Sequence, residues 1–354
     1  MVKQKLDPRL QARIEEDALD PQGFERPHAL MQAVEENLVP LLELAHRPVI
    51  SSRQFSREQL IQLSRLAARF ETQPSIISRP LTGKILISAF YEPSTRTRLS
   101  FESAWHRLGG DIMSITDPAS TGIAKGESLY DVGEMLNHYG DMVVLRDSNK
   151  DAVYEMLEGL RIPIINAGNG LDEHPTQAMA DIYALLKWQP ELMAEEPECR
   201  VRIGIIGVPS RMRTVRSLLI YLAQFAEGID EIVIIAEDDN GNSVFDPGQR
   251  EELEAVGLKL SVTPDMESVL PSLDVVYINA IAWTGDGYES HGTRYALNAD
   301  SDLKPGAIVL HPLARGAELD RSLDDTAHNW YFAQARGAVY IRMALLSAML
   351  KTFS

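Results

Sequence analysis

The fold of this chain is decided by the stretch FYEPSTRTRLSF, residues 90–101. It follows an apolar run at 84–90 that is typical of a buried strand. From Leu99 onward the apolar residues recur at helical spacing, until Gly109 and Gly110 end the pattern. The stretch is therefore predicted to form a strand-to-helix turn.

The residues of this turn suit an anion. Ser94 or Thr95 can cap the helix, and the N–H groups of its first turn are then free to face outward. Arg96 and Arg98 add positive charge where the helix dipole is already positive. An ordinary N-cap with solvated arginines is the alternative interpretation. Hydroxyl and guanidinium groups this close together favour a binding site for phosphate or another oxyanion.

Composition limits the kind of partner. The chain has 354 residues, of which 45% are hydrophobic, so it can bury a large core and is long enough for two domains. Its formal net charge of −17 argues against a surface for nucleic acid or an anionic membrane, so a positive site must be local and fit a small anion. Cys199 is the one cysteine, which fits a reducing compartment. The sequence shows no apolar signal-peptide core and no apolar segment of bilayer length, so we expect a cytoplasmic protein.

From residue 84 onward, strand and helix patterns alternate, as in a parallel sheet covered by helices on both faces. The first expected series has strands near 84–90, 111–115, 141–145 and 162–166, with helices near 95–108, 127–139, 152–160 and 175–187. The second has strands near 201–208, 231–236, 258–262, 274–279 and 307–310, with helices near 214–226, 249–256 and 266–271. We therefore predict an α/β protein with two doubly wound parallel-sheet domains and a ligand cleft between them.

The expected division of the chain follows these series. Residues 1–50 are predicted to be a helical extension, and 51–188 the domain that carries the anion turn. Residues 199–332 form the second domain, after a segment rich in proline and acidic residues. A last helix within 333–354 is long enough to return to the first domain.

Other polar residues follow expected strands. Arg146 ends one strand, and His174 and Gln177 begin a helix with Pro175 at its first position. Each has a structural alternative, because strand-end arginines are commonly solvated and histidines at helix starts commonly make structural hydrogen bonds. Beside an anion turn they are candidates for a second clamp and for hydrogen-bonding catalysts. The glycines near 204–207 lack dinucleotide-binding spacing, so a nicotinamide cofactor is not expected.

Taken together, these motifs resemble the aspartate/ornithine carbamoyltransferase family. They occur in the family's order and at close to its spacing over roughly 50–354, at residues 94–98, 125–127, 146, 174–177, 311–313 and 335–346. The His-Pro-Leu motif at 311–313 resembles the aspartate branch more than the ornithine branch, which has a cysteine after this histidine.

The resemblance implies that an amino group attacks the carbonyl carbon of carbamoyl phosphate and phosphate leaves, with no metal or organic cofactor. Matching positions imply that carbamoyl phosphate is bound by Ser94, Thr95, Arg96, Thr97, Ser120, Lys125, Arg146, His174, Gln177 and Leu313. Thr97, Lys125, Arg146 and His174 would be catalytic, with His174 donating to the carbonyl oxygen. Gln177 and the backbone carbonyl of Leu313 would hold the carbamoyl NH2. In the family the loop with Ser120 and Lys125 enters a neighbouring subunit's site, which implies a homotrimer with shared active sites.

The acceptor side departs from the pattern. Arg213 matches the family arginine that binds the α-carboxylate of aspartate, but Ala280 and Ala282 stand where aspartate enzymes have an arginine and a glutamine. A buried carboxylate without its guanidinium partner loses on the order of several kcal/mol. The identity of the acceptor is therefore open between an aspartate-like amino acid and an ornithine-like or other amine, and a non-catalytic homologue is a further alternative. Ala314 replaces a family proline, so we expect the local backbone to differ there.

Overall fold

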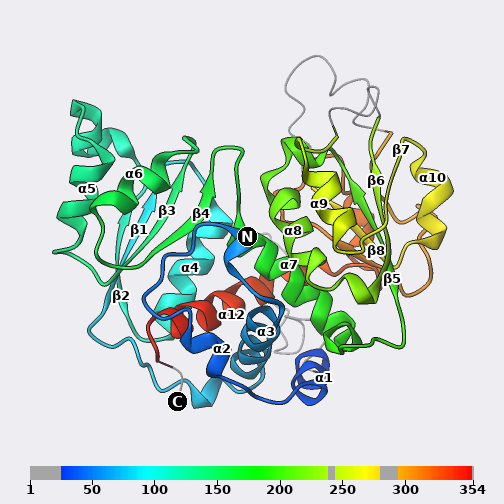
Figure 1. Cartoon of the computed structure of the whole chain (residues 1–354), viewed down its shortest axis with the longest axis horizontal. Helices are drawn as coiled ribbons and strands as arrows, with labels where there is room; N and C mark the ends of the chain where they lie inside the picture. The colour runs from blue at the N-terminus through cyan, green and yellow to red at the C-terminus, as the bar shows by residue number, and fades with distance from the viewer. Residues whose placement is uncertain (1–24, 238–243, 280–293, 353–354) are drawn as a thin grey trace, which may run out of the picture.

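The computed structural model describes residues 25–237, 244–279 and 294–352. It contains two α/β halves side by side, each built on a sheet in which every strand pair is parallel (Figure 1). The expected fold class, two parallel-sheet α/β domains, is confirmed.

The first sheet has the strand order β2-β1-β3-β4. Its strands are β1 (Ile85–Phe90), β2 (Asp111–Ile115), β3 (Met142–Asp147) and β4 (Ile164–Asn169). Its helices are α4 (Thr95–Arg107), α5 (Leu129–Leu136), α6 (Ala152–Gly159) and α7 (Pro175–Trp188). Helix α5 begins two residues later than the predicted 127, because the Ser128 side chain caps it by accepting from the backbone N–H of Asp131.

The second sheet has the order β7-β6-β5-β8-β9. Its strands are β5 (Val201–Ile206), β6 (Ile229–Ile235), β7 (Leu260–Thr263), β8 (Val275–Ile278) and β9 (Ile308–Leu310). Its helices are α8 (Arg213–Ala223), α9 (Gln249–Ala255) and α10 (Met266–Val269). The expected strands and helices of both series are thus present, with ends that shift by a few residues.

Strand order places the ligand site. In the first sheet β1 and β3 are neighbours although β2 lies between them in the chain, and Phe90 pairs with Arg146. In the second sheet β5 and β8 are neighbours in the same way, with Ile206 paired to Ile278. Chain connections leave such pairs in opposite directions, which opens a crevice at the carboxyl ends of the strands. The turn at residues 90–95 and the end of β3 are therefore brought together by topology.

Helices at both ends of the chain join the first half. The long helix α12 (Tyr331–Met349) packs on α4, α7 and α3 (Arg57–Thr72), and Figure 1 shows it crossing beneath the first sheet. Helix α3 starts with the predicted capping box of Ser56 and Gln59. From the expected N-terminal extension, α1 (Glu25–Ala33) packs on α3 and α7, and α2 (Val39–Leu42) on α3 and α12.

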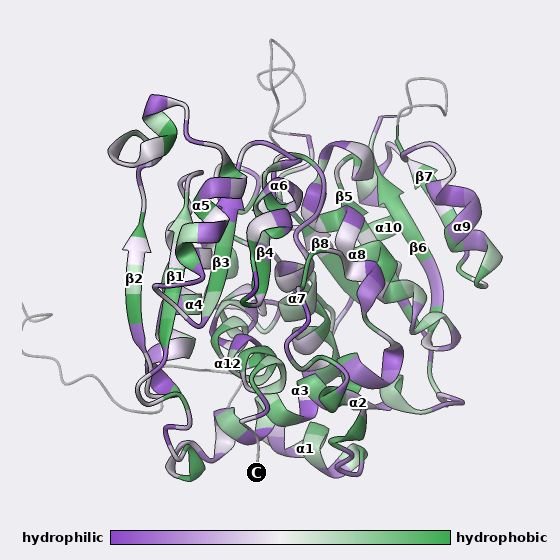
Figure 2. Cartoon of the chain, turned by 60° about the vertical axis from the view of Figure 1, so that its left-hand side comes forward, coloured by the Kyte–Doolittle hydropathy of each residue, from purple (hydrophilic) through white to green (hydrophobic). Residues whose placement is uncertain are grey.

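Burial separates central from edge strands. All residues of β8 and the first five of β3 are buried, and Figure 2 colours these central strands as largely hydrophobic. Strand β2 lies at the outer edge of its sheet and is mostly exposed; its Met113 is 48% exposed. None of the helices in the described segments combines the length and apolarity needed to cross a bilayer.

A buried ion pair joins the helices under the first sheet. Glu71 on α3 lies 3.1 Å from Lys187 on α7, and both side chains are almost fully buried. Tyr183 donates a 2.6 Å hydrogen bond to Glu71, and Arg336 on α12 lies 3.2 Å from it. One carboxylate therefore ties α3, α7 and α12 together.

We expect Glu71→Gln to lower the free energy of unfolding by about 3 kcal/mol, because it leaves the Lys187 ammonium buried without a full counter-charge. Glu134→Gln is the matched control: it removes the partner of Arg161 in a more exposed ion pair, 2.6 Å long, and should cost less than about 1 kcal/mol. Denaturant unfolding at equal protein concentration measures both. Equal losses in the two variants would contradict a structural role for the buried pair.

Candidate active site

A cavity of about 480 Å³ lies where the two halves meet. From the first half it is lined by the turn after β1, the end of β3 and the start of α7; from the second, by residues 211–214, Asn279 and the 312–313 segment. Most of the residues predicted for the site line this cavity: Ser94, Arg96, Thr97, Arg146, His174, Gln177, Arg213 and Leu313.

The N-terminus of α4 is open toward the cavity. Ser94 is the N-cap residue, but its side chain makes no capping hydrogen bond. Thr97 is buried, and no hydrogen bond or ion pair joins the Arg96 guanidinium to any residue in the described segments. Burial lowers the pKa of Arg96. The prediction that Arg98 adds its charge to the anion site beside Arg96 is wrong. Arg98 lies 3.2 Å from Glu102, one helical turn further on, and does not line the cavity.

Glu92, to which the sequence assigned no role, is the centre of the cleft's ion pairs. Its Oε1 accepts from Arg146 at 2.7 Å and from Arg213 at 2.9 Å, and its Oε2 accepts from Arg213 at 3.1 Å. Burial raises the pKa of Glu92, but the bonds and charges of the two arginines outweigh it and leave the pKa lowered. Glu92 and Arg146 belong to the first half and Arg213 to the second, so this carboxylate bridges the cleft.

Arg146 is held firmly in place. It is 9% exposed, and its Nη1 also donates to the backbone carbonyl of Ala167 in β4 at 3.2 Å. Burial and then the charge of Arg213 lower the pKa of Arg146. Its guanidinium is thus fixed by a neighbouring strand rather than solvated, which decides against the surface alternative for this residue.

His174 is the N-cap residue of α7 and is 3% exposed. Its backbone N–H donates to Ser217 Oγ at 3.0 Å, and its Nδ1 is buried without a hydrogen-bond partner in the described part of the chain. Burial first, and then the charges of Arg146, Arg213 and Arg342, lower the pKa of His174 well below its usual value. The imidazole is therefore neutral at physiological pH and can donate one hydrogen bond without carrying charge.

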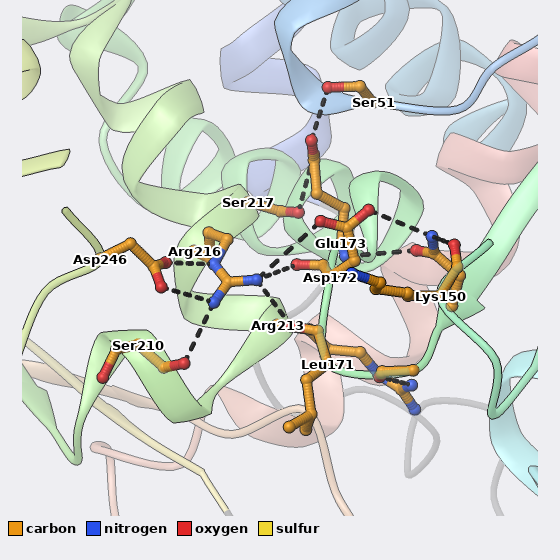
Figure 3. A network of polar contacts seen from close by, with 12 residues as sticks. Ser51, Lys150, Leu171, Asp172, Glu173, Ser210, Arg213, Arg216, Ser217 and Asp246 are labelled. Atoms are coloured by element: carbon orange, nitrogen blue, oxygen red, sulfur yellow. Dashed lines mark hydrogen bonds and ion pairs between the residues drawn. The ribbon is translucent and has the colours of Figure 1, made fainter. Parts of the chain in front are cut away.

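The loop before His174 is fixed by Arg216 and Ser217 of the second half and by Ser51 of the first (Figure 3). Arg216 on α8 donates to the backbone carbonyls of Leu171 at 2.7 Å and Asp172 at 2.9 Å, and pairs with Asp246 at 2.6 Å. Glu173 accepts from Ser51 Oγ at 2.5 Å and from Ser217 Oγ at 3.2 Å. Because these contacts come from several elements, the histidine has little freedom to move relative to α8.

The His-Pro-Leu segment has an unusual backbone. His311 is buried; its Nε2 lies 3.0 Å from Glu318, and its Nδ1 accepts from the Leu313 backbone N–H at 2.7 Å. Leu313 has a φ of 54°, and the bond from Leu313 to Ala314 is cis. Ala314, which stands where the family has a proline, is thus joined to Leu313 by a cis bond, a geometry that is far commoner before proline than before alanine.

Other predicted residues lie elsewhere. The side chains of Thr95, Ser120 and Lys125 do not line the cavity of their own chain. Ser120 and Lys125 belong to the loop after β2, at the outer edge of the first sheet (Figure 2). Ala280 and Ala282 lie outside the described residues. Within the described segments, no group of three or more His, Cys, Asp and Glu side chains is placed to hold a metal ion.

Fold and site together define a two-domain α/β protein with a cavity between its domains, at the switch points of two parallel sheets, whose lining includes Arg96, Arg146 and Arg213. Residues 47–187 match the carbamoyl-P binding domain of the aspartate/ornithine carbamoyltransferases, and residues 200–349 match the Asp/Orn binding domain of the same family. The chain belongs to the aspartate/ornithine carbamoyltransferase family.

Individual relatives agree with this membership. The chain is 37% identical over 317 residues to an aspartate carbamoyltransferase catalytic subunit of Methanopyrus kandleri, which covers 86% of this chain and 98% of that protein. A catalytic subunit of Chromobacterium violaceum is 35% identical over 309 residues, 85% of this chain and 97% of that one. The aspartate transcarbamoylase of Trypanosoma cruzi in complex with carbamoyl phosphate and aspartate is 30% identical, with a TM-score of 0.79 over 89% of this chain and 100% of that chain.

We expect Glu92→Gln to lower the free energy of unfolding by about 2 kcal/mol in phosphate-free buffer, because it leaves two guanidinium groups facing each other. Phosphate can supply the missing negative charge, so the rise in melting temperature on adding phosphate should be larger in the variant than in wild type. Calorimetry with and without phosphate measures this difference.

Glu102→Gln is the control for this prediction, because Glu102 binds Arg98 outside the cavity. It should lower stability but leave the phosphate-induced shift as in wild type. A shift in Glu92→Gln no larger than that of wild type would contradict the assignment of Glu92 as the counter-charge of the anion site.

Proposed function

We propose that this protein transfers the carbamoyl group of carbamoyl phosphate to the amino group of an aspartate-like amino acid and releases phosphate. One observation carries the proposal: a single cavity is lined by the open N-terminus of α4 and by Arg146, His174, Gln177 and Leu313. These are a phosphate cradle, a fixed cation, a neutral hydrogen-bond donor and two groups that recognise an amide. The family's structures with bound carbamoyl phosphate and aspartate support it.

Each end of carbamoyl phosphate has a partner in the proposed complex. Ser94, Arg96 and Thr97 bind the phosphate, because the guanidinium of Arg96 has no hydrogen-bond or ion-pair partner among the described residues and the helix N-terminus attracts anions. Arg146 and the neutral His174 donate to the carbonyl oxygen, where negative charge develops as the amine adds. Gln177 and the carbonyl of Leu313 accept from the carbamoyl NH2.

The reaction needs positioning rather than a covalent intermediate. The lone pair of the neutral amine forms a C–N bond to the carbonyl carbon, and the carbonyl electrons move to the oxygen. When these electrons return, the bond between the carbonyl carbon and the bridging oxygen breaks. Phosphate leaves with that oxygen and the electron pair of the broken bond, and takes up the proton that the amine loses. Phosphate is a good leaving group, so fixed donors at the oxyanion and correct alignment of the amine suffice.

The acceptor meets the second half of the site. Arg213 lines the cavity and is the proposed partner of the acceptor's α-carboxylate. This guanidinium is paired with Glu92 at 2.9 Å, which positions its charge across the cleft. The aspartate carbamoyltransferases among the relatives support an aspartate-like acceptor.

The direct test is release of phosphate from carbamoyl phosphate in the presence of aspartate, ornithine or amino acids with a single carboxylate. We expect aspartate to give the highest rate. Arg96→Ala should lower kcat/KM by about 100-fold or more, because it removes a charge that binds the phosphate of carbamoyl phosphate, the leaving group of the reaction. It should also abolish the thermal shift with phosphate. A wild-type protein that releases no phosphate with any acceptor would contradict the proposed activity.

We further propose a homotrimer in which each site receives Ser120 and Lys125 from a neighbouring chain. Both residues lie on a loop at the outer edge of the first sheet and away from the cavity of their own chain. Strand β2 beside them has an open edge and an exposed Met113, features that suit an interface. In the proposed trimer the Lys125 of one chain therefore enters the cavity of the neighbouring chain.

Mixing inactive chains tests this sharing. We expect His174→Ala and Lys125→Ala homotrimers each to be nearly inactive, and trimers reassembled from both to recover part of the wild-type activity. Recovery occurs because some sites then combine an intact His174 with an intact Lys125 from the neighbour. Mixing His174→Ala with Arg146→Ala is the control, since both residues belong to one chain's cavity. Equal activities in the two mixtures would contradict a shared site.

A further inference from the structure

Behind the cavity lies a buried carboxylate that the proposed reaction does not use. Asp181 is on α7, one helical turn after Gln177, and is 1% exposed. Its Oδ1 accepts from Gln177 Nε2 at 2.9 Å and from Gln334 Nε2 at 2.5 Å. Its Oδ2 accepts from the hydroxyl of Tyr277 at 3.0 Å. A single side chain thus collects three donors from α7, α12 and β8.

The chemistry of a carboxylate fixes the direction of these bonds. An ionised carboxylate can only accept, so each glutamine must turn its NH2 toward Asp181 and its amide oxygen away. For Gln334 the result is visible, because its Oε1 accepts from the backbone N–H of His311 at 2.8 Å. Gln177 lines the cavity, so its Oε1 is the group left to meet a ligand there.

Three hydrogen bonds and one nearby positive charge keep Asp181 ionised at neutral pH. Burial raises the pKa of Asp181 to about 6, while its three hydrogen bonds and the charge of the buried Arg342 on α12 oppose the rise. Burial also raises the pKa of Tyr277 well above its usual value, so this hydroxyl stays a donor. His174, with its lowered pKa, stays neutral over the same range. Asp181 is therefore the group in this network that changes charge just below neutral pH.

We propose that Asp181 is the positioning residue that makes the site select a carbamoyl group, by holding the amide oxygen of Gln177 toward the substrate's NH2. The inference rests on the proposed function and names the origin of its specificity. Acetyl phosphate has the shape of carbamoyl phosphate but carries a methyl group in place of the NH2. A fixed acceptor facing that methyl loses its hydrogen bond, which is the strongest means a site has to reject an analogue of equal size.

The experiment compares carbamoyl phosphate with acetyl phosphate as ligands of wild-type protein and Asp181→Asn. Asparagine has one acceptor oxygen and an NH2 that donates, so the amide of Gln177 is free to turn over. We expect the variant to bind carbamoyl phosphate about tenfold or more weakly and acetyl phosphate almost as wild type does, so that discrimination falls. General damage to the fold would instead weaken both ligands alike.

Two controls separate positioning from stability. Glu71→Gln removes another buried carboxylate, which binds Tyr183 and Lys187 away from the cavity, and should leave the ratio of the two dissociation constants unchanged. In a Gln177→Ala background, Asp181→Asn should cause no further loss of discrimination, since it acts through Gln177. An Asp181→Asn protein that discriminates as wild type does would overturn the proposal. Failure of wild type to bind carbamoyl phosphate would instead overturn the proposed function.

If Asp181→Asn does not fold, the proposal can be tested with wild-type protein by varying the pH. Protonation of Asp181 creates an O–H that donates, so the glutamine is no longer held, and discrimination should fall as the pH drops below about 6. The phosphate groups of the two ligands titrate alike, so their effect cancels in the ratio of dissociation constants. A ratio that stays constant from about pH 8 to pH 5 would overturn the proposal.

Discussion

The site depends on two guanidinium groups that meet around one carboxylate where the sheets face each other. Arg146 comes from the first half and Arg213 from the second, and Glu92 holds both within 2.9 Å. Without that negative charge the two cations would repel each other, and with it they stay close enough to act on one small ligand. The positive charge of the cleft is thus assembled locally, within a chain whose formal net charge is −17.

Around this centre the site is layered from the ligand outward. His174 and Gln177 reach the cavity from one helix start, while their backbone and side chains are fixed by Ser217 and Asp181. The fixing groups come from α8, α12 and β8 as well as from α7 itself, so both halves of the molecule determine the direction of each donor. Such preorganisation lowers the cost of orienting groups during the reaction.

Much of this arrangement could be predicted from the sequence, because strand and helix periods and the turn at 90–101 depend on local pattern. The predicted residues Ser94, Arg146, His174 and Gln177 all line one cavity for that reason. The role of Glu92 could not be predicted, since its partners Arg146 and Arg213 lie in distant segments of the chain and only the tertiary fold brings them to it. The direction of Arg98 was missed for a related reason: Glu102, one turn away, takes its charge.

Helix α12 has a consequence for how the protein is made. It packs on α3, α4 and α7, so the first half lacks one of its layers until residues 331–349 have left the ribosome. Domains usually fold in order of synthesis. Here the apolar faces of α3 and α7 that α12 covers stay exposed while the whole second sheet is translated. Chaperone binding to the nascent chain would protect these faces during that interval.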